Sequence, residues 1–123
     1  TVLHGDYRLD NILFRPSGDL VVLDHQMTQY GRAAVDVAYF ITTALDATDH
    51  DGEERMLRAY HDRLAASGVG GYGLATLRHY VELAKDVLGH SLVSFNEFLD
   101  TDMSDGDIPF AEQMARRLLG WLR

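Results

Sequence analysis

The stretch HGDYRLDN at residues 4–11 sets the interpretation of the whole chain. Two short apolar runs follow it, ILF at residues 12–14 and LVVL at residues 20–23, and the turn-forming sequence RPSGD separates them. Apolar runs separated by turn residues predict a β-hairpin. We expect a four-residue loop over residues 16–19, which is a common hairpin length.

The expected register pairs Ile12 with Leu23 and therefore places Asn11 opposite Asp24 at the open end of the hairpin. Directly opposed residues have Cβ atoms about 5 Å apart, so one amide oxygen and one carboxylate can reach a shared Mg²⁺. This ion takes few protein ligands and completes its shell with water and substrate phosphates. Asp6, five residues before Asn11, is then placed to orient or deprotonate an attacking hydroxyl. The same spacing fits the D-x-x-x-x-N part of a kinase catalytic loop.

Apolar residues at helical spacing follow a polar stretch at residues 26–32, which we expect to be a loop. The spacing predicts about four helices, the second ending near residue 67 and the third continuing to residue 99. These helices begin near Asp36, Asp51, Leu74 and Pro109. Asp36 and Asp51 stand at N-cap positions, and Glu54 gives Asp51 the spacing of a capping box. The sequence therefore predicts an α+β, mainly α fold: a small catalytic β-hairpin region followed by about four helices.

Length and composition exclude several classes of protein. The chain has 123 residues, 46% of them hydrophobic, and a formal net charge of −8, which indicates one acidic globular domain and argues against nucleic acid as a partner. The lack of cysteine excludes disulfides, zinc–thiolate sites and thiol nucleophiles. No apolar run is long enough to span a membrane, so we expect no membrane partner and a cytoplasmic location. The opening residues TVL are interpreted as the end of a buried strand.

The pattern HGD-x4-N, followed by a short hairpin and an aspartate that closes an apolar strand, resembles the aminoglycoside phosphotransferase and choline kinase group. These are small-molecule kinases with a protein-kinase-like fold. The sequences DHQ at residues 24–26 and DVAYF at residues 36–40 are most similar to the ecdysteroid-kinase-like branch of that group. The resemblance is specific over residues 2–41, and it implies that the fold is a protein-kinase-like C-terminal lobe.

The resemblance also implies an activity and its residues. The activity is the Mg²⁺-dependent transfer of the γ-phosphoryl group of ATP to a hydroxyl of a small molecule. Asp6 is implied to be the catalytic base, and Asn11 and Asp24 to bind Mg²⁺ and through it the nucleotide. His4 and Asp36 are implied to support the catalytic loop.

Two features depart from the pattern of protein kinases. His25 and Gln26 follow the metal aspartate where protein kinases have Phe-Gly, which favours a small-molecule kinase. The family clamps ATP phosphates with a strand lysine of an N-terminal lobe, whereas the one lysine here, Lys85, falls in a predicted helix. We therefore expect residues 1–123 to be a C-terminal lobe, a fragment that depends on an N-terminal lobe of the same polypeptide.

Two other hypotheses remain open from the residues. In the first, the chain is a truncated, non-catalytic lobe that serves as a binding module. In the second, it is a metal-dependent phosphohydrolase. The second would use His4, Asp6, Asp24 and His25. The sequence GVGGYG at residues 68–73 matches G-x-G-x-x-G, but it follows a predicted helix instead of a strand, so we interpret it as a connector.

Three aromatic residues of the helical part are candidates either for an acceptor pocket or for the core. They are Tyr72, Tyr80 and Phe95. Aromatic residues at helical spacing usually pack in a core.

Overall fold

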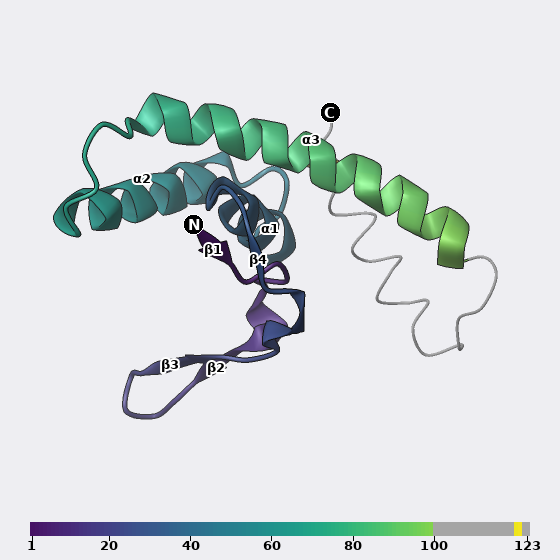
Figure 1. The fold of residues 1–123 in the computed structure, drawn as a ribbon, viewed down its shortest axis with the longest axis horizontal. Helices are drawn as coiled ribbons and strands as arrows, with labels where there is room; N and C mark the ends of the chain where they lie inside the picture. The colour runs from purple at the N-terminus through teal and green to yellow at the C-terminus, as the bar shows by residue number, and fades with distance from the viewer. Residues whose placement is uncertain (100–119, 122–123) are drawn as a thin grey trace.

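The computed structural model describes residues 1–99 and 120–121, and Figure 1 shows their arrangement. The helices and strands are β1 (Val2–Leu3), β2 (Ile12–Phe14), β3 (Leu20–Val22), β4 (Gln29–Tyr30), α1 (Ala34–Ala44), α2 (His50–Ala66) and α3 (Leu74–Leu99). Two single 3₁₀ turns, η1 (Leu9–Asn11) and η2 (His25–Met27), flank the hairpin. The chain is therefore mainly helical with a small β region, as the sequence predicts. The helix expected from Pro109 lies outside the described residues.

The β2–β3 hairpin projects from the helical body (Figure 1), and its register differs by one residue from the expected one. Ile12 pairs with Val22, not with Leu23. The reason is the turn: the Gly18 N–H donates to the Arg15 carbonyl (2.9 Å), and Gly18 has a φ of +88°. A turn followed by a left-handed glycine closes a hairpin over three residues. The expected four-residue loop is therefore wrong.

A second two-stranded sheet joins the start of the chain to the segment after the hairpin. β1 pairs antiparallel with β4, with Val2 opposite Tyr30. The segment expected to be a loop thus contains η2 and a short strand. A strand of two residues is too short to show an alternation of apolar and polar residues. Leu3 is buried, as expected for the opening strand, but Val2 is 60% exposed.

The core forms where α1 packs against α3, with α2 covering one side (Figure 1). Its buried residues are Ala34, Ala38, Ile41, Leu57, Leu77, Val81 and Ala84. Tyr60, Tyr72 and Tyr80 pack against this cluster. Tyr72 and Tyr80 are thus half-buried at the edge of the core, while the side chain of Phe95 lies outside the described part.

Lys85 lies on α3, as the sequence predicts, and its side chain is only 4% exposed. Its ammonium group pairs with Glu53 of α2 and with Glu82 (3.0 Å), and it lies 4.2 Å from the centre of the Trp121 ring. An ammonium group over an indole face gains a further electrostatic attraction. The one lysine of the chain is therefore committed to joining α2 and α3.

The helix starts differ from the expected caps. α1 begins at Ala34, which puts Asp36 in its first turn instead of at its N-cap. α2 begins at His50, and its N-cap is Asp49, whose carboxylate accepts a hydrogen bond from the Gly52 N–H (2.8 Å). Because the helix begins one residue after Asp49, Asp51 lies in its first turn and not at its N-cap. Both expected N-caps are wrong.

Removing the observed cap should destabilise the chain more than removing the expected one. Asp49→Ala is expected to lower the free energy of unfolding by about 1 kcal/mol, the usual cost of losing an N-cap side chain. Asp51→Ala should cost about 0.5 kcal/mol or less, because only its interaction with the helix dipole is lost. Urea denaturation followed by circular dichroism measures both. Equal losses would contradict the cap assignment.

No helix in residues 1–99 and 120–121 combines the length and apolar character needed to cross a membrane.

Candidate functional site

Asp36 fixes the backbone that leads to Asp6. Its carboxylate accepts hydrogen bonds from the N–H groups of His4 (2.7 Å) and Gly5 (2.9 Å). Hydrogen bonds to an ionised carboxylate are among the stronger ones in proteins. Since Asp36 belongs to the first turn of α1, the helical body holds this loop directly.

Gly5 allows the η2 turn to lie against the same loop. It has a φ of +86°, and a Cβ atom built on it would collide with the carbonyl oxygen of Met27 and lie 2.9 Å from the Met27 Cβ. Glycine adopts such a positive φ without the steric penalty that other residues meet. This position therefore needs glycine for both its backbone angle and its close contact.

His4 connects the loop to the end of β3. Its Nδ1 accepts a hydrogen bond from the Asp6 N–H (3.3 Å), so the ring proton lies on Nε2, which donates to the Leu23 carbonyl (2.8 Å). The residue is 9% exposed. His4 is thus a buried side chain with both ring nitrogens bonded to the backbone.

Asn11 and Asp6 are in direct contact. The Asn11 Nδ2 group donates to both the main-chain carbonyl and the side-chain Oδ2 of Asp6, each at 2.8 Å. Because the donor end of the amide faces Asp6, its oxygen Oδ1 is directed away from that carboxylate. An amide oxygen oriented in this way is a suitable ligand for a hard cation.

Arg8 and Tyr39 lie next to Asp6, and neither was predicted from the sequence to belong to the site. Arg8 Nε lies 3.3 Å from Asp6 Oδ1, and its guanidinium also pairs with Asp10 (3.6 Å). Burial raises the pKa of the Tyr39 hydroxyl well above its ordinary value, and the charge of Asp6 and a hydrogen bond to it raise it further. Tyr39 lies three residues after Asp36 on α1, a spacing that puts both on one helix face and that was the one available signal for it in the sequence.

Asp24 has an unusual backbone conformation. With φ 60° and ψ 66° it lies in the left-handed region, and it is the one non-glycine residue with a positive φ in the described part of the chain. Such conformations cost energy and cluster at functional sites. Its exposed carboxylate accepts a contact from Gln26 Nε2 (3.5 Å).

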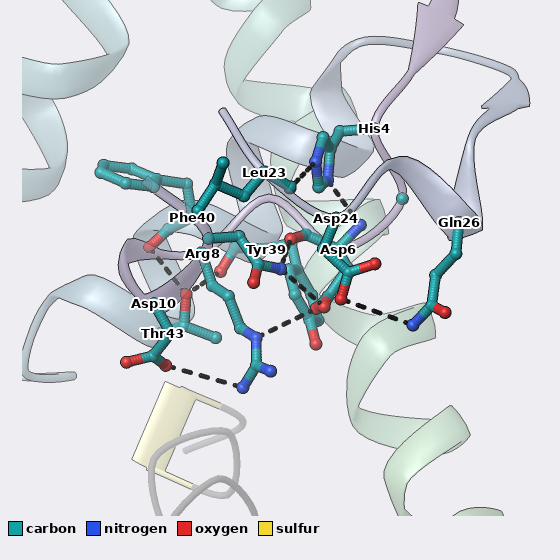
Figure 2. A network of polar contacts seen from close by, with 12 residues as sticks. His4, Asp6, Arg8, Asp10, Leu23, Asp24, Gln26, Tyr39, Phe40 and Thr43 are labelled. Atoms are coloured by element: carbon teal, nitrogen blue, oxygen red, sulfur yellow. Dashed lines mark hydrogen bonds and ion pairs between the residues drawn. The ribbon is translucent and has the colours of Figure 1, made fainter. Parts of the chain in front are cut away.

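The predicted opposition of Asn11 and Asp24 is wrong. The one-residue shift of register places Leu23 across from Asn11, and the Leu23 N–H donates to the Asn11 carbonyl (2.8 Å). Asp24 is the next residue, so it still leaves the hairpin at the end where Asn11 lies. Figure 2 shows Asp6, Asp24 and Gln26 within one region of polar contacts.

Two side chains at this end of the hairpin carry oxygen atoms of the kind that Mg²⁺ prefers. Asn11 Oδ1 and the Asp24 carboxylate are hard oxygen donors, and two protein ligands are usual for Mg²⁺ that also binds phosphates. The described residues contain no group of three or more histidine, aspartate or glutamate side chains able to hold a metal. The four residues of the phosphohydrolase hypothesis thus form no such group, and both nitrogens of His4 and Nε2 of His25 are bonded to backbone groups.

A largely apolar cavity of about 640 Å³ adjoins the loop. It is lined by residues of β1, β3, η2, α1 and α2 and reaches the loop at His4 and Tyr7. Asp6, Asn11 and Asp24 are not among its lining residues. The cavity thus lies beside the candidate site and does not contain its oxygen atoms.

The sequence model of the ecdysteroid kinase-like family matches residues 1–68, which is more than half of the chain. The chain therefore belongs to this kinase-like family, and the resemblance stated from its motifs is confirmed. Among curated proteins, the probable acyl-CoA dehydrogenase IBR3 of Arabidopsis thaliana is 42% identical over 40 residues. That match covers 31% of this chain and 5% of the plant protein. No solved structure matches the chain.

Proposed function

We propose that the chain is the C-terminal lobe of a protein-kinase-like small-molecule kinase. It transfers the γ-phosphoryl group of ATP to a hydroxyl of a small molecule. The observation that carries this proposal is the loop held by Asp36, in which Asn11 contacts the Asp6 carboxylate at 2.8 Å beside the strand end that bears Asp24. Membership of a kinase-like family supports it.

Asp6 is the group that orients the attacking hydroxyl. Its carboxylate already accepts a hydrogen bond from Asn11 and faces the Arg8 guanidinium, so these two contacts fix its direction. In phosphoryl transfer the transition state is loose, and positioning matters more than early removal of the proton. A fixed carboxylate meets that requirement.

Asn11 and Asp24 would hold Mg²⁺ on the phosphates of ATP. The bound ion supplies neutralisation of the charge that develops during transfer. His4 and Asp36 act on the same site through the backbone, since His4 bonds to the residue before Asp24 and Asp36 holds the residues before Asp6.

We also propose that the ATP-binding lobe of the same polypeptide supplies the lysine that clamps the phosphates. Lys85 is unsuited to this task because it is buried between Glu53 and Glu82. This commitment of Lys85 also favours a second candidate, a non-catalytic module. Titration calorimetry with Mg·ATP distinguishes the two, because only a catalytic protein with its N-terminal lobe should bind the nucleotide.

We do not extend dehydrogenase activity to this chain, because the segment shared with the plant protein covers 5% of that protein. A small-molecule alcohol is the proposed partner, with no nucleic acid or membrane, and the use of ATP fits a cytoplasmic location.

The direct test is transfer of label from [γ-³²P]ATP. The intact protein that carries this chain is incubated with a panel of hydroxylated small molecules, with and without EDTA. The expected result is a labelled phosphate monoester of at least one alcohol, formed with Mg²⁺ and lost with EDTA. Release of inorganic phosphate alone, at a rate independent of every alcohol, would contradict the proposal.

A further inference from the structure

The two carbonyl groups that precede Asp24 are each bonded to a histidine. The Leu23 N–H donates to Asn11, so these two form a hydrogen-bonded pair. In antiparallel strands such pairs alternate with non-bonded ones, and the Val22 carbonyl therefore points away from β2. It accepts from His25 Nε2 (3.2 Å), while the Leu23 carbonyl accepts from His4 Nε2 (2.8 Å).

The two imidazole rings also contact each other. Their centres lie 4.8 Å apart with the planes inclined at 60°. His4 is buried and has both ring nitrogens bonded, so it is a fixed surface for the more exposed ring of His25. His25 is thus located by two independent contacts, one polar and one between rings.

The backbone of Asp24, which follows these two carbonyl groups, is strained. Asp24 holds a left-handed conformation that a non-glycine residue keeps only when its surroundings impose it. Both peptide carbonyls immediately before it are restrained by histidine side chains. The direction of the Asp24 carboxylate therefore depends on this pair of rings.

We propose that His25 is a positioning residue for Asp24, which it holds in place through the Val22 carbonyl and through its contact with His4. The inference rests on the proposed function, in which Asp24 binds Mg²⁺. A phenylalanine at this position would fill a similar volume but leave the Val22 carbonyl without its donor. The N–H group of His25, and not only the volume of its ring, is therefore what restrains the Val22 carbonyl.

The test measures the binding of Mn²⁺, used as a probe for Mg²⁺, to the intact protein with ADP present, by electron paramagnetic resonance. Loss of a group that orients a metal ligand typically weakens metal binding 10- to 100-fold. His25→Phe is expected to weaken Mn²⁺ binding about 10-fold, and His25→Gln, which keeps an N–H donor, to restore part of it. His50→Phe, the same change at an exposed position on α2, should leave binding within twofold.

Circular dichroism at the assay temperature establishes that each variant is folded, so that a general loss of structure is separated from misplacement of Asp24. Asp24→Asn is measured in parallel. If Asp24→Asn weakens Mn²⁺ binding and His25→Phe does not, the inference is overturned and the proposed function stands. If Asp24→Asn leaves binding unchanged, the metal assignment of the proposed function fails and the inference fails with it.

Discussion

Asp6→Ala is expected to lower the rate of phosphoryl transfer about a thousandfold in the intact protein. A positioned carboxylate at the attacking hydroxyl typically contributes between about 10²- and 10⁴-fold. Affinity for Mg·ATP should stay within about threefold, because the proposed metal ligands are Asn11 and Asp24. Rates are measured by transfer of label and affinities by titration calorimetry. Loss of ATP affinity with transfer retained would contradict the role of Asp6.

Two further variants separate the charge of Asp6 from its volume and its neighbours. Asp6→Asn keeps the size of the side chain and is expected to be nearly as inactive as the alanine variant. Asp10→Asn removes a carboxylate that pairs with the same Arg8 guanidinium but is 75% exposed. It should retain the transfer rate within about twofold. A large loss in this variant would indicate that the charge of the whole loop matters instead of Asp6.

Gly5→Ala is expected to destabilise the chain by about 3 kcal/mol. A side chain at a positive φ costs roughly 1–2 kcal/mol, and forcing a methyl group into a packed contact adds about 1–3 kcal/mol. The contact in question is with Met27 of η2. The free energy of unfolding from urea denaturation measures the loss, and the transfer rate should fall as well because the loop before Asp6 must move.

Gly18→Ala is the matched control. Gly18 has nearly the same φ, +88°, but a Cβ atom there would meet nothing within 4 Å. Its loss should therefore be about 1 kcal/mol, from the backbone angle alone. Similar losses in both variants would show that the contact with Met27 contributes nothing.

The hairpin shows how far a sequence predicts a fold. Its apolar runs and turn residues were enough to predict that a hairpin exists. Its register depended on whether the turn takes three or four residues, and that was decided by the left-handed conformation of Gly18. Composition alone does not fix a single φ angle. The same limit explains why Asp51 was predicted as the N-cap of α2 when the cap is Asp49. Aspartate suits the position in both cases, so the residue type does not decide between them.

The candidate site divides in a similar way. The spacing from Asp6 to Asn11 fitted the pattern of a kinase catalytic loop, and the structure places the two residues in hydrogen-bond contact. Asp36 was assigned through the resemblance, and the structure places its carboxylate on the loop backbone. Arg8 and Tyr39 were missed because their contacts with Asp6 depend on side-chain direction, which a linear pattern encodes weakly.

The enclosure of Lys85 gives the folded chain a built-in chemical reporter. Its amine is the only one on a side chain in the sequence, and it lies between α2 and α3 with 4% of its side chain exposed. An acylating reagent can reach it only when these helices separate. The rate of acylation, followed by mass spectrometry, therefore measures how often this part of the molecule opens.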